Sequence, residues 1–119
     1  VETGLIGSGA YHVAVPVVHD NNCPCQYIMG QVINSAGAPV AGVWLKMRDQ
    51  WGNESTALSK SGAIDYGMFD FPIASGSPHE LYINVIGDGG VPLSAVVTIP
   101  HHQGEAADQS CHHIVFQGE

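Results

Sequence analysis

Glycine and proline punctuate this chain so often that long helices are excluded. The 119 residues include 15 glycines and 7 prolines, and both residue types disfavour helix interiors. Between them lie short segments rich in β-branched and aromatic residues, repeating about every 8 to 12 residues, which is typical of all-β folds. These segments predict strands over residues 11–18, 26–34, 40–49, 54–60, 66–72, 80–86, 92–99 and 111–117.

Apolar residues alternate with polar ones in several of these segments. The apolar sets are Val43, Leu45 and Met47, then Leu81, Ile83 and Val85, then Leu93, Ala95, Val97 and Ile99. The intervening residues Trp44, Lys46, Arg48, Tyr82, Asn84, Ser94 and Thr98 are expected on the opposite faces. One buried face per sheet predicts a β-sandwich of about seven strands, with an extra N-terminal strand.

Residues 1–22 are predicted to be an N-terminal extension of a sandwich domain at residues 23–119. The extension has a glycine-rich start and an apolar stripe of Tyr11, Val13, Val15 and Val17. Pro16 interrupts the stripe and suits an edge or crossing strand. Two interpretations stay open: the strand completes its own sandwich, or it is donated to a neighbouring copy as an assembly strand.

The charge balance excludes several classes of partner. The chain has 3 Lys and Arg against 11 Asp and Glu, with a formal net charge of −8. Nucleic-acid binding depends on basic side chains that contact phosphates, so this composition argues against it. A basic amphipathic membrane helix is excluded for the same reason. The apolar runs are also too short for a membrane-spanning helix, so we expect no membrane insertion.

Two motifs resemble a known family. Residues 28–43, with Gly30-Gln-Val32 and then Pro39-Val-Ala-Gly-Val43, resemble the opening of carboxypeptidase-regulatory-like and Cna-B-like domains. Residues 60–62 and 66–69 resemble the turn of this family, with an insertion at 63–65. The segment from residue 81 through Cys111 to Phe116 is similar to repeat domains of large secreted bacterial proteins. The resemblance covers about 90 of the 119 residues. It implies an Ig-like or transthyretin-like β-sandwich from a secreted or cell-surface protein.

The chain has three cysteines, Cys23, Cys25 and Cys111. Cys23 and Cys25 flank a single proline and cannot easily bond to each other. Either one paired with Cys111 would close a loop worth about 4–5 kcal/mol in the loop-entropy model. The family resemblance favours Cys25 with Cys111, which leaves Cys23 free or bridged to another chain. A disulfide predicts an extracellular setting.

Metal ligands are a weaker prediction. The doublets His101-His102 and His112-His113 would approach each other if residues 92–99 and 111–117 formed neighbouring strands, and imidazoles suit zinc or copper. Because neighbouring residues on a strand point to opposite faces, only one member of the second doublet could face an ion. Asp49 and Asp88 lie in turns that could offer oxygens to calcium. Polar histidines in loops and at strand ends, and ordinary turn residues, account for the same positions, so we expect no cofactor.

The sequence contains no recognised catalytic motif, so we expect no enzyme activity. The preferred interpretation is a structural or interaction module, a self-assembling subunit of an extracellular structure whose partners are copies of itself. The alternative is a polysaccharide-binding module that uses Trp51 in an exposed turn, with Trp44 and Tyr66. A metal-binding protein that uses the histidine doublets is the third interpretation.

Overall fold

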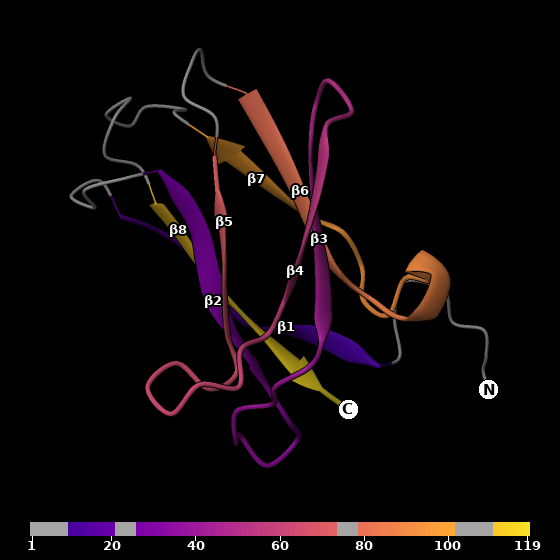
Figure 1. Ribbon diagram of the computed structural model, residues 1–119. Helices are drawn as coiled ribbons and strands as arrows, with labels where there is room; N and C mark the ends of the chain where they lie inside the picture. The colour runs from indigo at the N-terminus through magenta and orange to yellow at the C-terminus, as the bar shows by residue number, and fades with distance from the viewer. Residues whose placement is uncertain (1–9, 21–25, 74–78, 102–110) are drawn as a thin grey trace.

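The computed structural model describes residues 10–20, 26–73, 79–101 and 111–119, and this part of the chain is all-β. Its elements are β1 (Tyr11–Asp20), β2 (Tyr27–Ile33), β3 (Trp44–Asp49), β4 (Glu54–Leu58), β5 (Met68–Pro72), β6 (His79–Ile86), the 3-10 helix η1 (Asp88–Gly90), β7 (Val97–His101) and β8 (Cys111–Gly118). The strands form two four-stranded sheets (Figure 1). No described helix is long and apolar enough to cross a membrane.

The two sheets pack face to face. The first sheet has the order β1-β8-β2-β5 and the second β4-β3-β6-β7. All pairs are antiparallel except β2 with β8, which run parallel with Tyr27 opposite Cys111 and Ile33 opposite Gln117. The predicted β-sandwich of seven strands with an extra N-terminal strand is confirmed. The extra strand, β1, pairs with β8 of its own chain.

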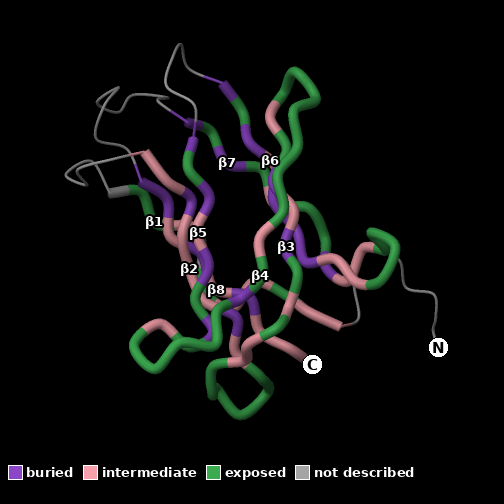
Figure 2. The backbone as a smooth tube through the Cα atoms, viewed as in Figure 1, coloured by how far each residue is buried: buried purple, intermediate pink, exposed green. Residues whose placement is uncertain are grey.

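The core lies between the sheets and is built from the inward half of each alternating strand. Buried stretches follow the strands while the hairpin tips are exposed (Figure 2). Leu45 and Met47 point inward on β3, as predicted, while Trp44 and Arg48 are exposed. The core cluster comprises Ile28, Val32, Leu45, Met47, Phe69, Phe71, Ile73, Leu81, Ile83, Val85, Ile99, Ile114 and Phe116.

The predicted strand at residues 92–99 is wrong at its start, because β7 begins only at Val97. Ser94 is buried and Ala95 is exposed, the reverse of the predicted alternation. The Ser94 hydroxyl accepts a hydrogen bond from the backbone N–H of Val85 at 2.9 Å. This side-chain bond draws a polar residue inward where the pattern favoured apolar ones. Asn84, which was also expected to face outward, is buried as well.

The apolar stripe of β1 is only partly confirmed. Tyr11, Val13 and Val17 pack against the core cluster, but Val15 is 44% exposed. The pairing of β1 with β8 shifts register between Val13 and Val15, and again between Val15 and Val18. Each shift breaks the strict alternation of faces, because a one-residue slip reverses the direction of the side chains. β1 is therefore an edge strand with an interrupted ladder.

Candidate functional site

Four histidines from four strands meet at one end of the sandwich, the end where β6 and β8 begin and β1 and β7 finish. In the first sheet, His19 of β1 lies opposite His112 of β8. In the second sheet, His79 of β6 lies opposite His101 of β7. His101 and His112 then join the two pairs across the sandwich. We call these four residues the histidine cluster.

Three of the four rings form a continuous chain of hydrogen bonds. Nδ1 of His19 lies 2.7 Å from Nδ1 of His112. Nε2 of His112 lies 2.8 Å from Nδ1 of His101. This series of hydrogen bonds ends at Gln26, the residue just before β2. Oε1 of Gln26 lies 3.0 Å from Nε2 of His101. The chain therefore links β1, β8 and β7 with the residue that precedes β2.

One set of tautomers lets three neutral imidazoles form these three hydrogen bonds. Oε1 of Gln26 can only accept, so Nε2 of His101 donates to it and Nδ1 of His101 accepts. Nε2 of His112 then donates to His101, and Nδ1 of His112 accepts from Nδ1 of His19. Each ring donates once, which is the capacity of a neutral histidine.

Burial sets the environment of the histidine cluster. His101 and His112 have no exposed surface and His79 is 5% exposed, whereas His19 is exposed. The His79 ring stacks edge-on against His101, with ring centroids 5.3 Å apart. An isolated charge is costly at such depth, so the hydrogen bonds within the cluster are what make it compatible with the core.

Asp49 and Trp51 lie beside the histidine cluster. The Trp51 and His79 ring centroids are 4.9 Å apart. The pKa of Asp49 is lowered from its ordinary value of 3.8, mainly by the hydrogen bond from the Asn53 side chain and also by nearby His79. Asp49 Oδ1 accepts from the backbone N–H groups of Trp51 and Asn53, both at 2.9 Å. Its carboxylate therefore organises the β3–β4 turn.

The metal prediction is altered by this geometry. His101 and His112 do meet, but they meet across the sandwich rather than along one sheet, because β7 and β8 belong to different sheets. His113 lies on the other side of β8 from the fully buried His112, and His102 lies outside the described residues. Across residues 10–20, 26–73, 79–101 and 111–119, no group of three metal-ligating side chains is placed to hold an ion.

The two predicted calcium aspartates are not brought together. Trp44 lies opposite Ile86 and Asp49 opposite Leu81, so β3 and β6 run side by side in opposite directions. Asp88 follows β6 in η1, beyond the Trp44 end of this pair. The two carboxylates are thus separated by the length of β3, about 20 Å for six residues.

The aromatic residues proposed for polysaccharide binding are also separated. Trp51 is 60% exposed and lies in the β3–β4 turn. Trp44 is 46% exposed at the opposite end of β3. Tyr66, 47% exposed, lies in the connection between β4 and β5, on the Trp44 side because Leu58 at the end of β4 pairs with Trp44. The structure therefore does not bring the three rings into one binding face.

Cys111 occupies the first position of β8 and is fully buried. Both Asp20 at the end of β1 and Tyr27 at the start of β2 lie opposite it in register. Cys23 and Cys25 belong to the segment between these two residues and lie outside the described residues. The choice between them stays a prediction.

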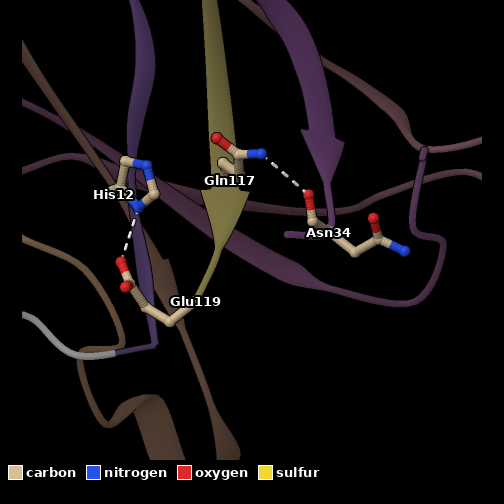
Figure 3. A network of polar contacts seen from close by, with 4 residues as sticks. All are labelled: His12, Asn34, Gln117 and Glu119. Carbon is tan, nitrogen blue, oxygen red and sulfur yellow. Dashed lines mark hydrogen bonds and ion pairs between the residues drawn. The ribbon is translucent and has the colours of Figure 1, made fainter. Parts of the chain in front are cut away.

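The other end of β1 is held by a different histidine contact. Nδ1 of His12 lies 2.6 Å from Oε2 of Glu119, and both side chains are about half exposed, at 50% and 52% (Figure 3). Next to it, the Gln117 side chain donates to the backbone oxygen of Asn34 at 3.1 Å (Figure 3). Both ends of β1 are therefore attached to β8 or its C-terminal continuation through histidine side chains.

Sequence reasoning missed His19 and His79. It singled out the doublets, in which only His101 and His112 belong to the cluster. His19 and His79 stand alone in the sequence, and their positions at strand ends were the available signal. Strand pairing and the packing of the two sheets bring them together, and neither is visible in local sequence.

Neither a protein-family model nor a curated protein matches this chain. The resemblance to carboxypeptidase-regulatory-like and Cna-B-like domains therefore stays a prediction drawn from the motifs.

Proposed function

We propose that this chain is a non-catalytic structural module of a secreted or cell-surface assembly, in which copies associate by exchanging β1. In the exchanged form, β1 of one copy pairs with β8 of the next. The contacts within the two forms are the same, so exchange costs little beyond opening and association.

The attachment of β1 is the observation that carries this proposal. Among the described residues, β1 lies at the edge of its sheet with β8 as its neighbouring strand, and the Tyr11 backbone N–H also donates to the Leu93 oxygen at 2.9 Å. Its ladder is interrupted by two register shifts. It nevertheless buries apolar side chains, because Tyr11, Val13 and Val17 pack on the core. β1 therefore contributes apolar side chains to the core but is held by one interrupted ladder of backbone hydrogen bonds. Such a strand is suited to replacement by an identical strand.

The cysteines support an extracellular setting for the module. We propose that Cys25 pairs with Cys111, next to the position where β1 ends. Such a bond would hold β2 and β8 together while β1 leaves. Cys23, which precedes Cys25 by two residues, is then available to another chain. A disulfide across nearly the whole domain is typical of secreted proteins.

Removal of β1 tests the proposal. We expect the full chain to sediment as a concentration-dependent oligomer and a chain lacking residues 1–20 to lose this association. A chain lacking only residues 1–9 is the matched control, because it keeps β1, and it should associate like the full chain.

A peptide of residues 10–20 separates loss of exchange from loss of folding. If the rest of the sandwich still folds without β1, the added peptide should occupy the place of β1. The circular dichroism and thermal stability of the full chain should then return, but association should not. Equal association of the full chain and the chain lacking residues 1–20 would refute β1 exchange.

A further inference from the structure

The position of β1 beside β8 contains a buried hydrogen-bonding group. His112 has no exposed surface, and its Nδ1 lies 2.7 Å from Nδ1 of His19. The other ring nitrogen of His112 is engaged with His101. The ring is therefore held on two sides, and it cannot turn toward a new partner without breaking its bond to the second sheet. Any strand that replaces β1 meets this fixed polar ring.

We infer that His19 is the specificity-determining residue by which this position accepts β1 of another copy of the same chain. The inference rests on the proposed exchange of β1. The expected occupant is a second copy, because an identical strand brings its own histidine to the place opposite His112.

The apolar residues of β1 supply affinity but little discrimination. Tyr11, Val13 and Val17 pack on the core, and many strands with alternating apolar residues would do the same. At position 19, however, an apolar side chain would cover His112 and remove the His19 hydrogen bond. The loss of a partner at a buried polar group reduces an equilibrium constant by about tenfold.

The contact at the other end of β1 provides the comparison. His12 and Glu119 are about half exposed, so water can replace their interaction when either partner is lost. Exposed ion pairs contribute little. Two histidines on the same strand therefore differ in one respect that matters here, the burial of their partner.

Reciprocal labelling of the full chain tests the inference. One dye is placed on the N-terminal amine and the other after Glu119. Because Tyr11 lies opposite Gly118, exchange brings residue 11 of one copy next to residue 118 of another, and energy transfer between the two dyes reports it. Wild-type copies are then mixed with His19→Leu copies at pH 7.5 in two experiments. In the first the wild type carries the N-terminal dye and the variant the C-terminal dye, and in the second the dyes are reversed.

The expected result is an asymmetry between the two assignments. A wild-type β1 should enter the sandwich of the variant readily, whereas the variant β1 should enter the wild-type sandwich about tenfold less well. His19→Gln, which keeps donor and acceptor groups, should recover part of the exchange. His12→Leu should give an asymmetry below about twofold.

The outcomes separate this inference from the function on which it rests. If wild-type copies show no energy transfer with each other, β1 exchange is wrong and the inference falls with it. If wild-type copies exchange but His19→Leu copies do so equally in both assignments, the role of His19 is wrong while the proposed function stands. Circular dichroism of each variant confirms that unfolded copies do not contribute.

Discussion

Single polar side chains set the two tight turns at opposite ends of the sandwich in the same way. Oδ1 of Asn34 accepts from the backbone N–H groups of Ala36 and Ala38 at 2.9 and 3.0 Å. Oδ1 of Asp49 likewise accepts from the backbone N–H groups two and four residues later, those of Trp51 and Asn53. In each turn a glycine with positive φ follows three residues after the acceptor, at 87° for Gly37 and 92° for Gly52. The sequence predicted the turn at Asp49, because the chemistry is local.

At the residue scale, replacement of Asp49 should show a pH dependence that Asn34 cannot have. The pKa of Asp49 is lowered in the folded protein, so its stabilisation is present above 3.8 and is lost as the pH falls through the lowered value. We expect Asp49→Asn to lower the urea midpoint at pH 7 and to differ much less from wild type at pH 3.

Asp88→Asn is the matched control for this experiment, because Asp88 is an exposed carboxylate in η1. It should leave the midpoint unchanged at both values of pH. An Asp49→Asn deficit that is the same at pH 3 and pH 7 would contradict the electrostatic part of the argument.

At the scale of elements, the parallel pairing of β2 with β8 depends on one glycine. A Cβ added to Gly30 would lie 1.7 Å from the backbone oxygen of Ile114 and 3.1 Å from the Phe69 ring. The nearest obstacle is backbone within a strand that is paired on both sides, so it cannot move away as a flexible side chain would. The glycine is required by the close approach of the strands.

Gly30→Ala should therefore destabilise the protein by about 3 kcal/mol, the upper part of the range for overpacked cores. Gly118→Ala is the control, because its added Cβ would meet Tyr11 at an ordinary contact distance of 3.5 Å. Urea denaturation of both variants measures the difference. Equal midpoints for the two variants would show that the strands can separate at Gly30 without cost.

The attachment of β1 leads to a second prediction at this scale. Because β1 has an interrupted ladder on one side only, its amides should open without global unfolding. We expect native-state hydrogen exchange to be at least about tenfold faster for the β8-bonded amides of β1 than for those of β2, which pairs on both sides. Equal protection of β1 and β2 would mean that β1 leaves only when the whole sandwich unfolds, and it would weaken the case for exchange.

The alternation of apolar and polar residues predicted those features of the fold that a single strand determines. Leu45 and Met47 were placed correctly, because a single strand determines which side chains share a face. Val15 was placed incorrectly, since the register shifts of β1 arise from its pairing with β8. His19 was not anticipated, because its neighbours come from a distant strand and, through His112, from the other sheet. The fold class was therefore predictable, while the histidine cluster required the packing of two sheets.

At the scale of the whole molecule, the proposed association must overcome the repulsion between copies of like charge. Each copy carries a formal charge of −8 with its seven histidines neutral. Protonation of all seven would bring the charge to −1, the sum of −8 and +7. Repulsion between copies acts over a Debye length of about 10 Å at 0.1 M salt and shrinks to about 3 Å at 1 M. Charge close to zero favours association.

The full chain should therefore associate more strongly when this repulsion is reduced, by either of two independent routes. We expect sedimentation equilibrium at pH 7.5 to show tighter association in 1 M than in 0.05 M sodium chloride. At 0.05 M salt, a change from pH 7.5 to pH 5.5 should act in the same direction, because protonated histidines add positive charge that offsets the negative charge. If salt strengthens association but acid weakens it, protonation must disrupt a contact that association needs, and the histidine cluster at the end of β1 is the structural element that contains such contacts. If neither route has an effect, charge repulsion does not limit the assembly.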